Sequence, residues 1–125
     1  MEMSWSCVFH PKFKLEFDEL PEEVQDELLA RVVLLEACGP RLKRPHADTL
    51  GGSRHANMKE LRFEADGGVW RVAYAFDTVR QGILLVAGDK SGGSQKRFYK
   101  KLIAKADDRF DEHLAAMKEK RSDDG

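Results

Sequence analysis

A hairpin signal in the middle of the chain constrains its fold more than any other feature. Two runs rich in apolar residues, Met58 to Glu64 and Val69 to Phe76, flank Ala65-Asp66-Gly67-Gly68. Asp-Gly-Gly supplies the positive-φ positions that a tight turn needs, so the two runs are predicted to pair as antiparallel strands. The continuous apolar run from Ile83 to Ala87 predicts a third, buried strand.

Patterns on either side of these strands complete the predicted fold. Alternation from Trp5 to Phe9, ahead of His10-Pro11, predicts a first strand that ends at the proline. Apolar residues three or four positions apart predict a helix from Leu20 to Leu35, which Gly39-Pro40 closes. The same spacing predicts a long amphipathic helix from Phe98 to Met117.

The order strand, helix, three strands and helix predicts the α+β class. We expect a small, antiparallel-rich β-sheet that packs against the N-terminal and C-terminal helices, with both helices on one face. The 125 residues, of which 42% are hydrophobic, fit one domain over residues 1–125, with a frayed tail over residues 118–125. Prolines and glycines between Arg41 and Arg54 predict an irregular, basic loop.

Charge is strongly segregated along the chain, although the formal net charge is only −1. That value argues against a simple polyanion binder, because phosphate recognition depends on basic surface. The segment from Glu16 to Glu27 nevertheless carries acidic residues and no basic one, whereas Arg41 to Arg62 and Lys90 to Lys101 are rich in lysine and arginine. We therefore expect an acidic face and two basic segments that meet in space.

The sequence argues against several classes of protein. No run approaches the roughly 20 apolar residues of a membrane-spanning helix, and no basic n-region of a signal peptide is present. A cytoplasmic protein with no membrane partner is expected. Cys7 and Cys38 make no disulfide framework. Cys7 and His10 have a C-x-x-H spacing, but a structural zinc site needs about four ligands, so we expect no metal and no cofactor.

Basic residues on or beside the predicted strands are the strongest sign of a site. Lys59, Arg62 and Arg71 lie on strands, while Lys90 follows the last strand and Tyr99 comes nine residues later. Rigid strands hold side chains firmly, as catalysis requires. The plainer interpretation is a solvated strand face, on which these cations pair with neighbouring carboxylates at little energetic consequence.

Strict alternation of side chains assigns each of these residues to one face of the sheet. Arg71 lies opposite the face of Trp70 and Tyr74, which we expect to be core, and its small neighbours leave it room. Lys59 falls on one face of its strand, and Arg62 falls on the other with Glu60. The two cations therefore line one site only if a β-bulge intervenes.

Four stretches carry a resemblance to a known family: Met58-Lys59-Glu60-Leu61-Arg62-Phe63, Val69-Trp70-Arg71-Val72-Ala73-Tyr74, Ile83 through Lys90, and Phe98-Tyr99. They resemble the RelE/ParE superfamily of toxins, and within it the HigB branch of phage-derived Gp49-like proteins. The resemblance implies a small sheet with helices on one side and no metal. It also implies cleavage of messenger RNA in the ribosomal decoding site by the RNA's own 2′-hydroxyl. A co-expressed antitoxin, expected to be of the helix-turn-helix type, would silence the toxin.

The resemblance implies roles for individual residues. Arg71 resembles a strand arginine that steadies the scissile phosphate, Lys90 a second cation after the final strand, and Tyr99 an aromatic hydroxyl near the start of the last helix. Fixed cations stabilise the charge of a pentavalent transition state. The expected catalytic residues are Arg71, Lys90, Tyr99 and Glu60, and the expected RNA-binding residues are Arg54, His55, Lys59, Arg62, Lys96 and Arg97.

The sequence leaves both the proton acceptor and the activity open. An ordinary tyrosine titrates near ~10, so Glu60 and His55 are rival acceptors to Tyr99. Glu60 also stands where the RelE branch often has a basic residue. Besides a ribosome-dependent ribonuclease, the alternatives are a ParE-type gyrase inhibitor that hydrolyses nothing and a catalytically inactive, phage-derived binding protein, because fold alone does not separate them.

Overall fold

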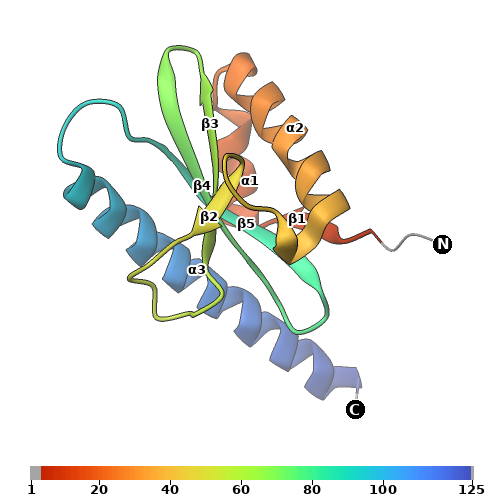
Figure 1. Cartoon of the computed structure of the whole chain (residues 1–125). Coiled ribbons are helices and arrows are strands. Elements are labelled where there is room, and N and C mark those ends of the chain that lie inside the picture. Colours follow the sequence, from red (N-terminus) through yellow and green to blue (C-terminus); the bar gives the residue numbers. More distant parts are fainter. Residues whose placement is uncertain (1–3, 125) are drawn as a thin grey trace.

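The computed structural model describes residues 4–124, and the side chains of residues 4–120. Its elements are β1 (Ser6–Phe9), α1 (Pro11–Asp18), α2 (Glu22–Cys38), a short 3-10 helix η1 (Gly39–Arg41), β2 (Ala47–Thr49), β3 (Lys59–Ala65), β4 (Gly68–Phe76), β5 (Gln81–Asp89) and α3 (Gln95–Asp124). The strands form a five-stranded sheet in the order β1-β5-β4-β3-β2 (Figure 1). β1 runs parallel to β5 and the other neighbouring pairs are antiparallel, which confirms the predicted α+β class.

The predicted hairpin lies at the centre of the architecture and sets the register of the site. Between β3 and β4, Asp66 and Gly67 take φ values of 51° and 74°, as the turn chemistry requires. The register places Arg62 opposite Arg71. Directly opposed residues on adjacent strands share one face of the sheet, so their side chains meet.

Helices cover both faces of the sheet, and the expectation of one covered face was wrong. Residues of α1 and α2 pack with Val72 and Tyr74 on one face, whereas residues of α3 pack with Ala73 and Ala75 on the other. Figure 1 shows α3 crossing the sheet on the side away from α1 and α2. The unbroken apolar run in β5 has this cause, because a strand that is buried on both faces has no polar alternation.

Two short elements differ from the sequence prediction. α1, which the sequence did not predict, begins at Pro11 and buries Phe13 and Phe17. The His10 side chain caps it by accepting a hydrogen bond from the Lys12 N–H at 3.1 Å. β2 lies within the predicted irregular loop, where fully buried Ala47 pairs with the middle of β3. The loop prediction was wrong there because three residues suffice to extend a sheet but are too few to show a period.

α3 is longer than the predicted helix at both ends. It runs from Gln95 to Asp124, so residues 118–124, for which the sequence predicted a frayed tail, are helical. Residue 125 lies outside the described residues. The helix packs on the sheet through Leu102, Ala106 and Phe110, at the spacing that the sequence indicated. No helix within residues 4–124 is both long and apolar enough to cross a membrane.

Candidate active site

A cluster of four polar side chains lies between the sheet and the start of α3. Its members, here called the Arg71 cluster, are Glu60 and Arg62 of β3, Arg71 of β4 and Tyr99 of α3. The Tyr99 hydroxyl donates to Glu60 Oε1 at 2.9 Å and accepts from Arg71 Nε at 3.2 Å. Arg62 donates to Glu60 Oε2 at 2.7 Å, and Arg71 Nε lies 3.9 Å from Oε1. One carboxylate is therefore held between two guanidinium groups and a phenol.

A close approach of α3 to β5 brings Tyr99 over the cluster. Gly88 lies opposite Arg71 in the β4–β5 register, and a Cβ at this position would stand 2.8 Å from the ring of Phe98. Because glycine lacks that atom, the Phe98 ring packs directly on the strand. Tyr99 is the next residue of the helix, and its hydroxyl reaches the neighbouring strands.

The burial of this cluster argues against the interpretation of a solvated strand face. Glu60 is 3% exposed and Arg71 is 6% exposed. The sequence indicated that the small neighbours of Arg71 would leave it open space. That expectation was wrong, because α3 packs over these neighbours. Arg71 also donates to the Trp70 carbonyl oxygen at 2.9 Å. Buried charges with several hydrogen bonds are fixed in place, which suits electrostatic catalysis.

The protonation of Tyr99 decides its chemical role. Burial raises the pKa of Tyr99, the hydrogen bond from Arg71 opposes this shift, and the hydrogen bond to Glu60 reinforces it. The phenol therefore keeps its proton at neutral pH and acts as a donor. Glu60 accepts hydrogen bonds from both Tyr99 and Arg62. The rival acceptor His55 lies elsewhere, with Nε2 2.7 Å from Asp111 Oδ1.

An open pocket of about 580 Å³ adjoins the cluster at the edge of β3. Arg62 and Arg71 belong to both the cluster and the pocket. The other lining residues come from α2, from the segment before β2 and from the hairpin: Arg31, Arg44, Pro45, His46, Phe63, Glu64 and Val69. Four arginines and one glutamate make this lining basic. The sequence analysis missed Arg31, Arg44 and His46, and the available signal was that Arg31 is the lone basic residue of α2.

The two cations of β3 lie on opposite faces, as alternation predicted. Lys59 Nζ donates to the Pro40 carbonyl oxygen at 2.8 Å, whereas Arg62 joins the Arg71 cluster. β3 and β4 pair without interruption, and the register shift lies instead between β4 and β5, at Ala73 and Tyr74. No bulge therefore brings Lys59 to the site.

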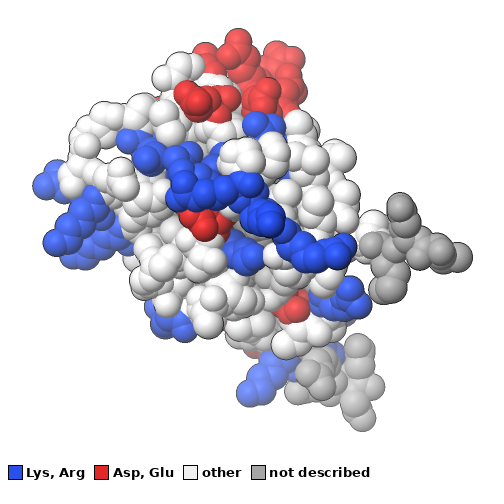
Figure 2. Space-filling view, in the orientation of Figure 1, with Lys and Arg blue, Asp and Glu red and all other residues white. Residues whose placement is uncertain are grey.

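Three further expected cations surround the start of α3. Half-buried Lys90 follows β5, where its backbone N–H donates to the Val69 carbonyl oxygen at 2.8 Å. Lys96 and Arg97 are exposed in the first turn of α3. None of the three side chains forms an ion pair with the side chains described, those of residues 4–120. Figure 2 shows Lys and Arg in a band across this face and over the start of α3, and Asp and Glu near the hairpin and the start of α2.

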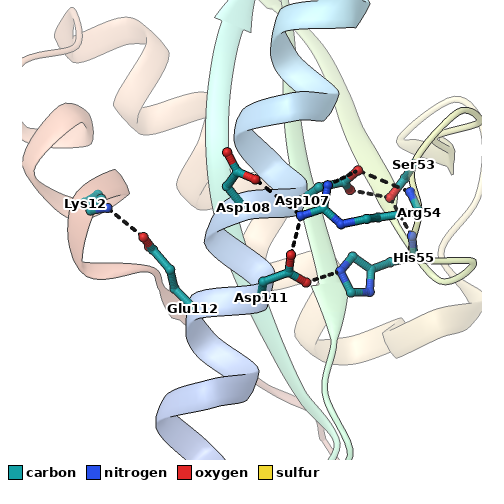
Figure 3. Close-up of polar contacts among 8 residues, drawn as sticks. All are labelled: Lys12, Ser53, Arg54, His55, Asp107, Asp108, Asp111 and Glu112. Atoms are coloured by element: carbon teal, nitrogen blue, oxygen red, sulfur yellow. Dashed lines mark hydrogen bonds and ion pairs between the residues drawn. The ribbon is translucent and has the colours of Figure 1, made fainter.

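Arg54 and His55 lie apart from the Arg71 cluster, bound to a later part of α3 (Figure 3). We call this second group the α3 clamp; its members are Ser53, Arg54, His55, Asp107, Asp108 and Asp111. Arg54 forms ion pairs with all three aspartates, and Ser53 donates to Asp107 at 2.5 Å. The carboxylates compensate the charge of Arg54, so its surroundings do not support the expected RNA-binding role.

Cysteine and histidine side chains outside these two clusters offer no second reactive site within residues 4–120. Among the described residues, no three or more His, Cys, Asp and Glu side chains are placed to hold a metal ion. Cys7 lies on β1, where burial, followed by the charge of Glu36, raises the pKa of the thiol to about 12. Such a thiol is unreactive at neutral pH. His10 caps α1 through one ring nitrogen and binds Glu112 at 3.0 Å through the other.

Comparisons with known proteins find a matching family model and similar proteins that are named as toxins. The family model described as "Phage derived protein Gp49-like (DUF891)" matches residues 15–111. "Putative toxin HigB2" of Mycobacterium tuberculosis is 43% identical over 101 residues, which are 80% of this chain and 50% of HigB2. "Putative toxin HigB3" of the same organism is 40% identical over 111 residues, which are 89% of this chain and 95% of HigB3. The chain thus spans about half the length of HigB2 and nearly all of HigB3.

A solved structure shows the same fold. The E. coli toxin RelE, in a double arginine-to-alanine mutant studied in the free state, matches with a TM-score of 0.59 and 14% sequence identity. The match covers 82% of this chain and 97% of the RelE chain.

The fold and the relatives define the class as RelE/HigB-type toxins. Within this class, the chain belongs to the phage-derived Gp49-like family, whose model covers most of its length.

Proposed function

We propose that this chain is the toxin of a type II toxin–antitoxin system and that it cleaves messenger RNA on the ribosome without a metal ion. The observation that carries the proposal is the Arg71 cluster, in which Glu60 lies between two guanidinium groups, and both of these also line a basic pocket. A toxin that only blocks its target has no need of a proton acceptor beside convergent cations. HigB2, HigB3 and RelE are all named as toxins, which supports the class.

The proposed reaction is a transesterification within the RNA. Glu60 accepts the proton of a 2′-hydroxyl, the 2′-oxygen bonds to the adjacent phosphorus, and the bond from phosphorus to the 5′-oxygen breaks. Tyr99 supplies a proton to the departing 5′-oxygen and recovers one from Glu60, to which it is hydrogen-bonded. The products are one RNA that ends in a 2′,3′-cyclic phosphate and one that begins with a 5′-hydroxyl.

Arg62 and Arg71 stabilise the charge that gathers on the phosphate oxygens during this step. Both side chains line the pocket, and each is anchored by a hydrogen bond within the cluster. Donors that are already fixed need no reorganisation when the charge develops, and this accounts for most of their benefit. Lys90, at the end of β5, contributes a second type of cation with a flexible stem.

Two partners belong to the proposal. The band of lysines and arginines in Figure 2 suits the phosphates of ribosomal RNA. An antitoxin of the helix-turn-helix type would silence the toxin by covering this band or by clamping the helices, with a segment that becomes ordered on binding.

Mapping the 5′ ends of messenger RNA after brief induction tests the proposal. The informative variant is Arg71→Lys, because alanine would leave the buried Glu60 and Tyr99 short of a partner and threaten the fold. Arg54→Lys makes the same chemical change in the α3 clamp and is the matched control. We expect discrete in-frame cuts with the wild type and with Arg54→Lys, and a loss of about 100-fold or more with Arg71→Lys.

Other outcomes of the same experiment point to the rival functions. Intact messages in cells whose growth is arrested would sink the ribonuclease and favour a gyrase-type inhibitor. Unchanged growth at normal protein level would favour a binding protein without activity.

A further inference from the structure

The pocket beside β3 is larger than the proposed reaction needs, because that reaction uses only Arg62 and Arg71 from its lining. One edge of β3 pairs with β2 and with His46, the residue before it. This pairing ends at Arg62, whose N–H donates to the His46 carbonyl oxygen at 2.8 Å. Beyond this point no strand within residues 4–124 pairs with that edge of β3. The pocket lies there, between Arg31 of α2 and Arg44. Its volume of about 580 Å³ is typical of a site for a small ligand.

The arginines of the pocket have donor groups that the described residues do not use. Arg31 Nε is buried and has no hydrogen-bond partner among the described residues, although Nη1 donates to Glu27 at 3.2 Å. Arg62 donates to Glu60 through Nη1, and no partner within residues 4–120 takes its other nitrogens. A guanidinium carries five N–H donors in a planar fork that matches phosphate. Arg44 pairs with Asp48 through Nε and Nη2, each at 2.8 Å, and no partner within residues 4–120 takes its Nη1. The pocket therefore offers unused donors to an anionic ligand.

The pocket also has surfaces that suit a nucleobase. Phe63 lines it, and the guanidinium carbon of Arg31 lies 5.8 Å from the centre of the Phe63 ring. Alternate residues of an antiparallel strand direct their N–H and C=O to the same side. Glu64, two residues after Arg62, therefore presents both main-chain groups along the open edge of β3. Guanidinium planes stack on unpaired bases, and hydrogen-bonding groups read the edges of such bases.

We propose that this pocket binds one nucleotide of single-stranded RNA beside the cleaved bond and contributes to the sequence preference of cleavage. The proposal rests on the proposed ribonuclease function and deepens it. Arg44 holds a backbone phosphate and Arg31 stacks on the base. Because Arg62 and Arg71 line the pocket and also belong to the Arg71 cluster, an RNA strand bound at the cluster enters the pocket directly.

The charge around the pocket favours RNA over an acidic protein segment. Glu64 also borders a neighbouring hollow that is lined by Glu23, Asp26 and Glu27 of α2. An acidic peptide carries negative charges along its whole length, and these carboxylates would repel it. A nucleotide places its phosphate at the arginines and a neutral base toward Glu64, so it avoids the repulsion.

Binding of a short RNA to the full chain tests the pocket without requiring catalysis. The probe is a fluorescently labelled, 2′-O-methylated hexaribonucleotide, which has no free 2′-hydroxyl and is not cleaved, and fluorescence anisotropy gives the Kd. Arg44→Ala removes an exposed arginine of the pocket, and Arg31→Lys keeps the charge but loses the planar group. Arg41→Ala, exposed on η1 and outside the pocket, is the matched control for charge. We expect Kd to rise about tenfold for Arg44→Ala and Arg31→Lys and to stay within about twofold for Arg41→Ala.

Circular dichroism melting verifies that each variant is folded, and Arg44→Ala keeps the test valid if Arg31→Lys melts early. Equal weakening by Arg44→Ala and Arg41→Ala would overturn the pocket, because only overall charge would then matter. The proposed RNA pocket would also be overturned if Arg44→Ala abolished binding of a poly-glutamate peptide and left RNA binding unchanged.

A second readout separates the pocket from the ribonuclease proposal. In the 5′-end map, Arg44→Ala should cut messenger RNA less efficiently, because it binds RNA more weakly, and with a weaker preference for the base beside the cut. Pocket-dependent RNA binding without any cutting would overturn the ribonuclease alone. Cutting by Arg44→Ala with unchanged preference and unchanged RNA binding would overturn the pocket alone.

Discussion

Two charged clusters join α3 to the sheet and its loops, and the balance of charge within them is opposite. In the Arg71 cluster, at the start of the helix, Arg62 and Arg71 face the single carboxylate of Glu60. In the α3 clamp, about two turns further on, three aspartates face Arg54 and His55. The first cluster adjoins a basic pocket, whereas the second compensates its own charge. The proposed function accordingly uses the cluster whose positive charge is left in excess.

The region around the α3 clamp is built to position the helix. Arg109 donates to Glu16 at 2.8 and 2.5 Å and to the Leu85 carbonyl oxygen at 2.8 Å. His113 binds Asp77 at 2.8 Å in the turn after β4. These contacts fix α3 to α1, β5 and the β4–β5 turn, whereas Tyr99 is held by its own hydrogen bonds to Arg71 and Glu60. If the proposed function holds, the region around the α3 clamp holds the helix and the Arg71 cluster provides the chemistry.

The largest effect that would sharpen this contrast is expected from Glu60→Gln. The amide cannot accept the 2′-hydroxyl proton, so single-turnover cleavage on ribosomes should slow by about 1,000-fold. The substitution also leaves Arg62 and the buried Arg71 without their carboxylate, so the melting temperature should fall, and cleavage is compared at a temperature where the variant is fully folded. Glu119→Gln, exposed on α3, is the control and should cleave like the wild type. If the Glu60→Gln variant cleaved at the wild-type rate, the Arg71 cluster would have a structural role and no catalytic one.

The next effect is expected in the second region, from Arg109→Ala. Arg109 is 6% exposed, and its loss removes charge-assisted hydrogen bonds and packing worth ~2–3 kcal/mol of unfolding free energy. Urea unfolding measures this change, with exposed Lys105→Ala as the control. At a temperature where the variant is fully folded, cleavage should match the wild type. Lost cleavage in the folded variant would contradict the separation of the two regions.

The fold could be predicted wherever a pattern extends over several residues. The hairpin turn followed from Asp66 and Gly67, and it fixed the register that joins Glu60, Arg62 and Arg71. Tyr99 was singled out beside the strand cations, but its role as an aromatic hydroxyl of the site came from the resemblance. Periodicity does not say which face a helix covers, and the approach of α3 depends on the absence of a side chain at Gly88.

The pocket and the α3 clamp could not be predicted, because each joins distant segments. Arg31 and Arg44 reach β3 from α2 and from a loop, and no local pattern relates them. Arg54 was expected to bind RNA because basic residues were added up along the chain. Its real neighbour Asp111 lies 57 residues later, so the compensation of its charge is a tertiary effect.

A smaller effect is expected from Arg54→Ala, which tests the α3 clamp directly. Arg54 is more than half exposed, so solvent screens its ion pairs and their removal should lower the unfolding free energy only slightly. RNA binding and cleavage should stay within about twofold of the wild type. Anisotropy with the hexaribonucleotide and the 5′-end map measure both. A tenfold loss of RNA affinity would return Arg54 to the binding surface and remove the contrast between the clusters.

The smallest effect is the pH dependence of the clamp. Hydrogen bonds from Arg54, and then from His55, hold the pKa of Asp111 below its usual range. A carboxyl whose pKa is lowered by folding stabilises the protein above its unfolded pKa of about 3.9 and loses this contribution as the pH falls through the folded value. Asp111→Asn should therefore melt slightly below the wild type at pH 7, and the gap should narrow below about pH 4. Asp111 is nearly half exposed, so solvent screening keeps the gap small.

Melting curves of both proteins from pH 7 to pH 2 measure the gap. A gap of constant size would mean that Asp111 acts through its shape and hydrogen bonds, and charge balance would no longer distinguish the clamp from the Arg71 cluster.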